Sequence, residues 1–227
     1  MTLVESIRGR LIVSCQAYPG EPMRDPRTMT QIAQAAVIGG AAAIRAQGLD
    51  DIASIRDAVT VPLIGLVKVG HDGVFITPTL EAALAVVDAG ADVVALDGTG
   101  RTRADGRTLA DTVGQFRARR PGSLLMADVS TYDEGVAAAA AGVHLVGTTL
   151  AGHTAYSRQG DGPDFELLER LAADLDVPVL AEGRIHTPAL AAEALRRGAH
   201  SVVVGTAITH PTTITSWFAD ALRPPGS

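Results

Sequence analysis

Short apolar runs alternate with longer amphipathic segments from one end of the chain to the other. Eight runs are almost continuously apolar, at residues 11–15, 42–46, 63–68, 93–97, 124–129, 144–149, 179–183 and 201–205. Segments with helical periodicity follow them, at residues 28–38, 50–58, 79–89, 108–119, 132–140, 165–174, 188–197 and 213–222. Continuously apolar strands are typical of parallel sheets covered by helices. Eight strand–helix units predict an α/β fold, a (β/α)8 TIM barrel, with residues 1–227 as a single domain.

An open, doubly wound sheet shows the same alternation and is the alternative to the barrel. The absence of an obvious edge strand among the eight units favours the closed barrel. A repeated glycine supports the unit boundaries, because Gly40, Gly90, Gly142 and Gly198 each stand between a predicted helix and the next strand. Glycine is preferred just past a helix C-terminus because it tolerates positive φ.

Charge and composition restrict the partners and the compartment. The chain has 19 Lys and Arg against 25 Asp and Glu, a net charge of −6, which argues against a nucleic acid or a membrane surface as partner. No apolar stretch approaches the roughly 18 residues of a membrane helix, and the run at 11–15 is too short for a signal peptide. The single cysteine, Cys15, excludes an internal disulfide. We expect a cytoplasmic protein.

Charged residues stand at the ends of the predicted strands, where barrel enzymes carry their catalytic groups. Lys68 follows an apolar strand, and burial beside the cation Arg45 lowers the pKa of an amine until it can act as a base. Glu182 ends the seventh strand, across the barrel, which suits general acid–base catalysis. We expect Lys68 and Glu182 to be catalytic. Three roles stay open for Arg45 and Asp128. They can orient the lysine, bind substrate, or form an ion pair that is only structural.

The alternatives for these two residues stay open. Lys68 is equally suited to Schiff-base formation or to proton transfer, and a lysine pointing to solvent at the barrel rim is its structural alternative. Glu182 has a salt bridge to Arg45 or Arg184 as its structural alternative.

The loops after the seventh and eighth strands resemble a phosphate site. Barrels often bind phosphate there, on backbone N–H groups near a helix N-terminus. Gly183 and Arg184 follow the seventh strand, and Gly205 and Thr206 follow the eighth. The glycines let the backbone approach an anion, and Arg184 adds a positive charge. The structural alternative is that these glycines only relieve crowding at the barrel mouth.

Other chemistries find little support in the sequence. The six histidines are scattered without metal-ligand spacing, so we expect no metal site. No nucleotide-binding fingerprint and no nucleophile elbow occur, so we expect no cofactor and no Ser/His/Asp catalysis. Cys15 is expected to be a small buried residue.

Nine stretches spread over almost the whole chain carry a family resemblance. They read IVSCQ (12–16), PGEP (19–22), IRA (44–46), IGLVK (64–68), VFITPT (74–79), ALD (95–97), MADVS (126–130), AEGRI (181–185) and VVGTAIT (203–209). In these stretches the chain resembles the N-acetylmannosamine-6-phosphate 2-epimerases of bacterial sialic acid breakdown.

The resemblance implies an isomerase that inverts C2 of N-acetylmannosamine 6-phosphate, by deprotonation and reprotonation, to give N-acetylglucosamine 6-phosphate without a cofactor. By matching position, it implies that Lys68 and Glu182 are catalytic, that Gln16, Arg45 and Asp128 contact substrate, and that Gly183, Arg184, Gly205 and Thr206 hold the phosphate. A small-molecule sugar phosphate is then the expected partner. A homodimer is also expected, because the helices near 33–36 and 136–141 are rich in small residues and can pack closely.

The sequence departs from the family pattern at three places. His210 stands where the resemblance predicts an arginine, the loop at 69–73 is shorter and less charged, and Gly98-Thr99-Gly100 replaces a more polar run. A shifted substrate preference follows as a hypothesis. Another sugar-phosphate isomerase, a Schiff-base lyase and a non-catalytic sugar-phosphate binding protein are the alternative functions. Proton transfer by one base or by two stays open.

Overall fold

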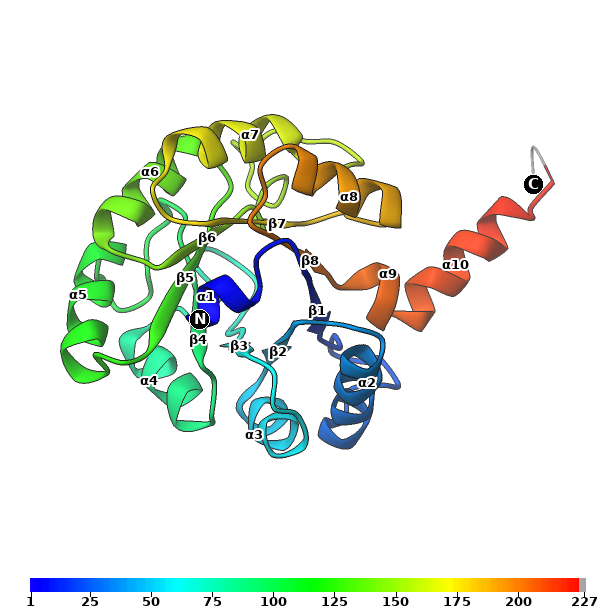
Figure 1. Ribbon diagram of the computed structural model, residues 1–227, viewed down its shortest axis with the longest axis horizontal. Helices are drawn as coiled ribbons and strands as arrows, with labels where there is room; N and C mark the ends of the chain where they lie inside the picture. Colours follow the sequence, from blue (N-terminus) through cyan, green and yellow to red (C-terminus); the bar gives the residue numbers. More distant parts are fainter. Residues whose placement is uncertain (225–227) are drawn as a thin grey trace.

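The computed structural model describes residues 1–224, which contain a closed barrel of eight parallel strands (Figure 1). The strands are β1 Leu11–Cys15, β2 Ala43–Gln47, β3 Leu63–Leu66, β4 Val93–Asp97, β5 Leu124–Asp128, β6 Leu145–Gly147, β7 Val179–Glu182 and β8 Ser201–Val204. Each strand pairs with the next along the chain, and β1 pairs with β8, with Ile12 opposite Val203. The predicted (β/α)8 barrel is therefore confirmed, and the open sheet is excluded.

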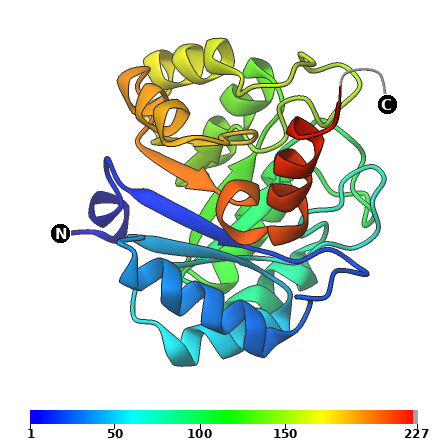
Figure 2. The ribbon, with the colours of Figure 1, turned by 90° about the vertical axis from the view of Figure 1, so that its right-hand side faces the viewer.

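Most of the helices surround the barrel on its outside (Figures 1 and 2). In chain order the helices are α1 Leu3–Ser6, α2 Pro26–Ile38, α3 Leu49–Ala58, α4 Leu80–Asp88, α5 Leu109–Arg119, α6 Tyr132–Ala141, α7 Phe165–Asp174, α8 Pro188–Arg196, α9 Thr206–Thr209 and α10 Pro211–Ala221. The glycines Gly40, Gly90, Gly142 and Gly198 all have φ between 92° and 107°, as their place between helix and strand predicts.

The helix boundaries differ from the predicted ones where local chemistry outweighs periodicity. Helix α2 begins at Pro26, two residues before the predicted start, because the Asp25 side chain caps the helix and a proline is favoured in its first turn. Two helices, α1 and α9, were not predicted, because four residues are too few to show a helical period. None of the helices within residues 1–224 is long and apolar enough to cross a lipid bilayer.

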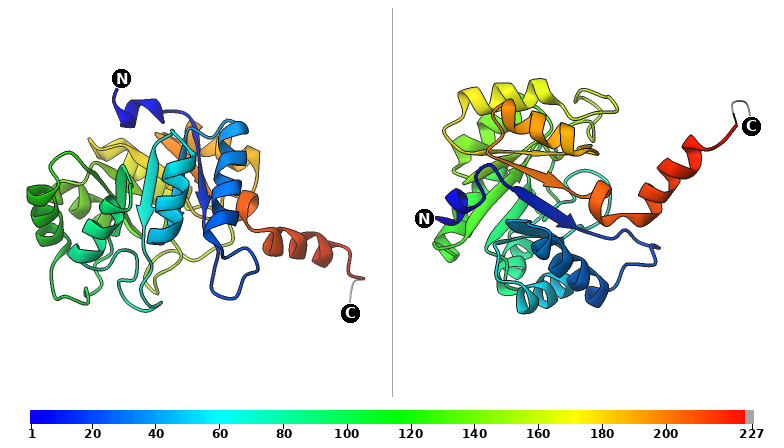
Figure 3. Two further views of the ribbon diagram at one scale, coloured as in Figure 1. Left: turned by 90° about the horizontal axis from the view of Figure 1, so that it is seen from below. Right: turned by 45° about the vertical axis from the view of Figure 1, so that its right-hand side comes forward.

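The core has two layers, one inside the barrel and one between the strands and the helices. Side chains such as Ile64, Met126 and Leu180 fill the barrel interior. The N-terminal segment closes one end of the barrel, where Ile7 is buried and the Val4 carbonyl lies 2.8 Å from His200 Nε2. Figure 3 shows α1 at this end and the long connecting loops at the other. The site must therefore open at the C-terminal ends of the strands.

Helix α10 departs from the arrangement of the other helices. It projects away from the barrel (Figures 1 and 3), and none of its residues is buried. Its aromatic residues are exposed, Trp217 by 37% and Phe218 by 70%. The predicted helix at 213–222 is present, but its apolar side chains lack the cover that the strand-facing helices have.

Candidate active site

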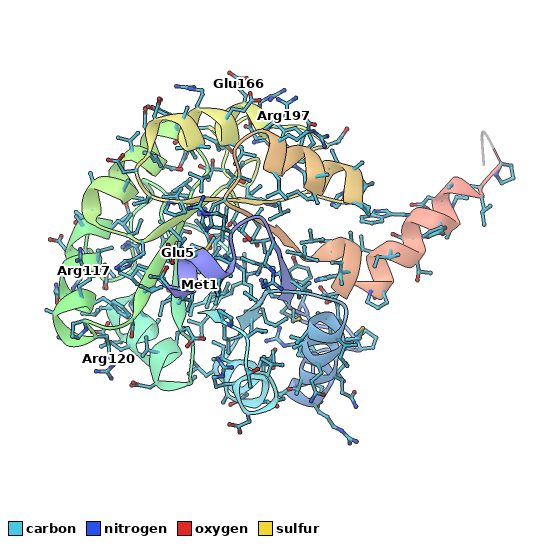
Figure 4. The ribbon with its side chains drawn as sticks, viewed as in Figure 1. Met1, Glu5, Arg117, Arg120, Glu166 and Arg197 are labelled. Atoms are coloured by element: carbon cyan, nitrogen blue, oxygen red, sulfur yellow. The ribbon has the colours of Figure 1, made fainter. Side chains whose placement is uncertain are left out.

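A cavity of about 730 Å³ opens at the C-terminal ends of the strands. Eight of the nine predicted site residues line it: Gln16, Arg45, Lys68, Glu182, Gly183, Arg184, Gly205 and Thr206. The ninth, Asp128, is completely buried and lies outside the cavity lining. Other charged residues lie outside the barrel: Figure 4 shows Arg117, Glu166 and Arg197 on the outer layer of the molecule, pointing away from the barrel. The barrel topology thus brings the predicted residues together.

Arg45 is the central charge of the site. Its Nη2 lies 2.7 Å from Asp128 Oδ2, and its Nη1 lies 3.1 Å from both Asp128 Oδ1 and Glu182 Oε2. Burial disfavours the charged guanidinium, but the two carboxyl groups outweigh it and raise the pKa of Arg45. Within residues 1–224, its buried Nε–H finds no hydrogen-bond partner. One permanent positive charge therefore lies between two acids.

Glu182, at the end of β7, retains its proton more strongly than an ordinary glutamate. Burial raises the pKa of its carboxyl to about 7, and the nearby negative charge of Asp128 acts in the same direction. Arg45 and Lys68 oppose this rise. Near neutral pH the carboxyl populates both protonated and ionised forms, as an acid–base group requires.

Lys68 is the only lysine in the sequence. Strand β3 ends two residues earlier, at Leu66, and a small hairpin then holds Lys68, with Val69 N–H donating to Phe75 O at 3.0 Å and Thr77 N–H to Val67 O at 2.7 Å. The ammonium lies 5.2 Å from the centroid of the Tyr18 ring.

The pKa of Lys68 is lowered, mainly by burial and then by Arg45, while Glu182 and Asp128 oppose the change. Both causes inferred from the sequence therefore operate. One cavity holds an amine that loses its proton more easily than usual and a carboxyl that retains its proton more strongly.

Gln16 and Ser14 line the cavity from the β1 side. The Gln16 amide donates to Ser14 Oγ at 2.7 Å. The Thr209 hydroxyl of α9 donates to the Ser14 carbonyl at 2.8 Å, which connects the segment after β8 to β1. This hydrogen bond orients the Gln16 side chain. The side-chain oxygen of Gln16 takes no part in it.

The predicted phosphate residues open into the same cavity, from the loops after β7 and β8. Arg184 has a φ of 54°, in the left-handed region, and its Nε donates to the Gly162 carbonyl at 2.8 Å. Its guanidinium also packs directly on Gly152, where a side chain would collide with it. The Arg184 side chain is thus held by the loop after β6, while Gly205 and Thr206 approach from the β8 side.

His210 occupies the position where the resemblance predicts an arginine. Its side chain is 4% exposed, and Nδ1 lies 3.5 Å from Glu21 Oε1. Its ring lies 5.0 Å, between centroids, from Tyr18, whose backbone N–H donates to Glu21 Oε2 at 2.6 Å. His210 therefore contacts the loop after β1 as well as lining the cavity.

Sequence reasoning missed two cavity residues with direct contacts to the candidate catalytic groups. The Thr149 hydroxyl lies 2.6 Å from Asp128 Oδ1 and 3.1 Å from Glu182 Oε2. Its place just beyond β6 was the available signal. Tyr18, which faces Lys68, lies in a loop and carries no such signal.

The structure also describes Cys15 and the side chains that could bind a metal ion. Burial, with a smaller contribution from Asp51, raises the pKa of Cys15 to about 12, so this thiol stays protonated near neutral pH. Among the residues that the structure describes, no group of three or more His, Cys, Asp or Glu side chains could hold a metal ion.

Comparison with known proteins identifies the family. Residues 29–224 match the profile of a family described as "Putative N-acetylmannosamine-6-phosphate epimerase". Proteins named "Putative N-acetylmannosamine-6-phosphate 2-epimerase" include one from Cutibacterium acnes, 55% identical over 97% of both chains. Another, from Caldanaerobacter subterraneus subsp. tengcongensis, is 47% identical over 98% of this chain and 95% of its own.

A solved structure agrees with the sequence relatives. The N-acetylmannosamine-6-phosphate 2-epimerase from Clostridium perfringens superposes with a TM-score of 0.94 at 43% identity, covering 98% of this chain and 97% of the other. Barrel, cavity and sequence therefore lead to one assignment: the chain belongs to the N-acetylmannosamine-6-phosphate 2-epimerase family, a family of isomerases.

Proposed function

We propose that this protein interconverts N-acetylmannosamine 6-phosphate and N-acetylglucosamine 6-phosphate by moving a proton at C2, with Lys68 as base and Glu182 as the second acid–base group. The observation that carries the proposal is the pairing of Lys68 and Glu182 in one cavity, with their pKa values shifted toward each other. The names of the family's relatives supply the substrate.

The open-chain form of the sugar makes this chemistry accessible. Its C1 aldehyde acidifies the hydrogen on C2. Neutral Lys68 takes that proton, and the C2–H electron pair moves through C1 onto the carbonyl oxygen to form an enolate. Arg45 stabilises the negative oxygen with its charge, a type of contribution typically worth a few kcal/mol.

Reprotonation of C2 on the opposite face completes the inversion. Protonated Glu182 gives its proton to C2 and becomes a carboxylate, while Lys68 remains as an ammonium. One proton then passes from the Lys68 ammonium to the Glu182 carboxylate, directly or through solvent. Both groups are back in their starting forms, so the cycle consumes no acid or base. Ring opening is a further step that Glu182 is placed to assist.

The remaining predicted residues receive positioning and binding roles. Gly183, Arg184, Gly205 and Thr206 would hold the 6-phosphate at the side of the cavity between β7 and β8. Gln16 would contact a sugar hydroxyl or the acetamido group. Asp128 lies behind Arg45, and we therefore assign it the task of fixing the guanidinium rather than touching the sugar.

The test is a proton NMR time course with N-acetylmannosamine 6-phosphate in D2O, with Lys68→Ala and Glu182→Gln variants. We expect deuterium to appear at C2 as the second epimer accumulates, and both variants to lose at least about 100-fold in rate. Epimer formation without C2 exchange would refute direct proton transfer. Because Lys68 is the only lysine, a borohydride-stable adduct on that residue would instead identify a Schiff-base enzyme.

We further propose that the protein is a homodimer formed through α10. This helix carries Ile214, Trp217, Phe218 and Leu222 at helical spacing, and its own barrel buries none of them. Apolar side chains on one helix face are stabilised by a partner surface, here a second copy. Sedimentation equilibrium should give a dimer, and Phe218→Glu should shift it toward monomer. A monomeric parent protein at micromolar concentration would contradict the proposal.

A further inference from the structure

One hydroxyl group lies between the two acids of the site. Thr149 follows β6, and in the barrel β6 stands between β5, which carries Asp128, and β7, which carries Glu182. Thr149 Oγ1 lies 2.6 Å from Asp128 Oδ1 and 3.1 Å from Glu182 Oε2. No direct hydrogen bond between the two carboxyl groups is found among the described residues. The threonine therefore connects them.

The Thr149 hydroxyl has a single proton, so it can donate a hydrogen bond to only one of the two carboxyl groups. A hydroxyl has one proton to donate and two lone pairs to accept. Asp128 is a carboxylate bound through both oxygens to Arg45, and 2.6 Å is the length of a hydrogen bond from a hydroxyl to a charged oxygen. The Thr149 proton therefore points to Asp128, and a lone pair of Oγ1 faces Glu182.

Glu182 Oε2 meets that lone pair favourably only when Oε2 carries a proton. We propose that Thr149 is a positioning residue, which accepts a hydrogen bond from protonated Glu182 while it donates one to Asp128. This contact fixes the carboxyl group and stabilises its protonated form, from which the substrate takes the proton. The role rests on the acid–base function proposed above for Glu182.

The groups around Glu182 are consistent with this role. Arg45 Nη1, 3.1 Å from Oε2, and Lys68 favour the ionised form, whereas burial and Asp128 favour the protonated form. Burial, then Glu21 and then Glu182 raise the pKa of the Tyr18 phenol. The balance holds the pKa of Glu182 at about 7. A small contribution from one hydroxyl therefore changes how much protonated acid is present near neutral pH.

The neighbouring threonine performs a different task, which provides a comparison. Thr148 Oγ1 donates to the Glu182 carbonyl at 2.9 Å and accepts from the Glu182 N–H at 3.0 Å. Thr148 thus holds the backbone of Glu182, and Thr149 contacts its side chain. A role that merely stabilises β7 belongs to Thr148.

The test compares Thr149→Val, which keeps the shape and loses the hydroxyl, with Thr149→Ser, which keeps the hydroxyl. The carboxyl of Glu182 is titrated by carbon-13 NMR in protein labelled at the glutamate side chains, and its signal is assigned by its loss in Glu182→Gln. We expect Thr149→Val to lower the pKa of Glu182 by about 0.5–1 pH unit, because the protonated form loses an acceptor. Thr149→Ser should stay at the parent value. An unchanged or raised pKa in Thr149→Val overturns the proposal, since a raised pKa would mean that the hydroxyl donates to Glu182.

Activity gives the second readout. With N-acetylmannosamine 6-phosphate we expect Thr149→Val to lose about tenfold in kcat with little change in KM, and Thr149→Ser to restore the rate. Thr149→Ala serves if the valine variant does not fold, as checked by thermal unfolding. If the parent protein inverts no C2 centre, the proposed function fails, whereas the titration still decides the role of Thr149. An active parent with an equally active Thr149→Val variant refutes the positioning role alone.

Discussion

The two carboxyl groups of the site are coupled, so removing the charge of one changes the titration of the other. Asp128→Asn is the perturbation. Because Thr149 Oγ1 lies 2.6 Å from Asp128 Oδ1 and 3.1 Å from Glu182 Oε2, the two carboxyl oxygens are within about 6 Å of each other. At an effective dielectric constant of about 20, two unit charges at that distance repel by about 3 kcal/mol, which corresponds to about 2 pH units.

The direction follows from which form of Glu182 the charge disfavours. Negative Asp128 disfavours ionised Glu182 and so raises the pKa of that carboxyl, which is about 7 in the parent protein. In Asp128→Asn the ionised form becomes more favourable and Arg45 is left with Glu182 as its charged partner. We expect the pKa of Glu182 to fall to about 5. The pH above which protonated Glu182 is lost, and with it the proton delivered to substrate, should move down by the same amount.

The assay is the carbon-13 carboxyl titration, supported by the pH profile of kcat/KM. Nitrogen-15 labelling of lysine adds a signal that needs no assignment, because Lys68 is the only lysine. Its pKa should also fall, since Asp128 favours the ammonium. Breaking a buried ion pair costs about 3–5 kcal/mol of stability, so thermal unfolding must show that the variant is folded at the assay temperature.

Asp97→Asn is the matched control. Asp97 is also buried at a strand end, but it binds Thr99 and Arg101 instead of Arg45. This variant should leave the pKa of Glu182 near 7. If Asp128→Asn also leaves it there, or raises it, the electrostatic account of the site is wrong.

Three further experiments test other parts of the structure. Gly65→Ala should lower the free energy of unfolding by about 1–3 kcal/mol in chemical denaturation, because the added Cβ would lie 2.7 Å from Ala91 Cβ and 2.8 Å from Val86 Cγ1. The control Gly122→Ala should leave that free energy unchanged, because a Cβ there would have nothing within 4 Å. Equal effects of the two substitutions would contradict the packing argument. Native Cys15 should not react with a thiol reagent at pH 8 until the protein unfolds, since its thiol is buried with a pKa of about 12; rapid labelling of folded protein would refute this. His210→Arg should lower KM for the sugar phosphate several-fold without changing kcat, because arginine carries a permanent charge at the cavity wall; an unchanged KM would exclude a substrate contact at this position.

Much of the site could be predicted because the C-terminal ends of all strands in a parallel barrel lie at the same mouth. A residue's place at a strand end in the sequence therefore predicts its place in the structure. Lys68 and Glu182 lie at or just beyond the ends of β3 and β7, and strand ends of a closed parallel barrel meet at one mouth whatever the loops do. The fold followed from the same regularity. Periodicity alone was enough to place eight strands and to locate the face on which the chemistry lies.

What the sequence left undetermined depends on side-chain partners. Arg45 and Asp128 were both recognised, but nothing local shows that they bind each other and leave Asp128 behind the guanidinium. The contact of His210 with Glu21 joins residues from opposite ends of the chain. Helix α10 shows the same limit, since an amphipathic pattern predicts an apolar face without showing which surface covers it.

The barrel can close only after nearly the whole chain has been synthesised. The bond that joins Val4 to His200 connects residues 196 positions apart, and β1 finds its second neighbour only in β8. A ribosome that adds about 5–20 residues per second needs about 10–40 s to deliver that partner. Throughout this interval β1 presents an apolar, unpaired edge of the kind that associates with other nascent chains. Protecting that edge during synthesis, for example with a chaperone, should therefore raise the yield of folded protein.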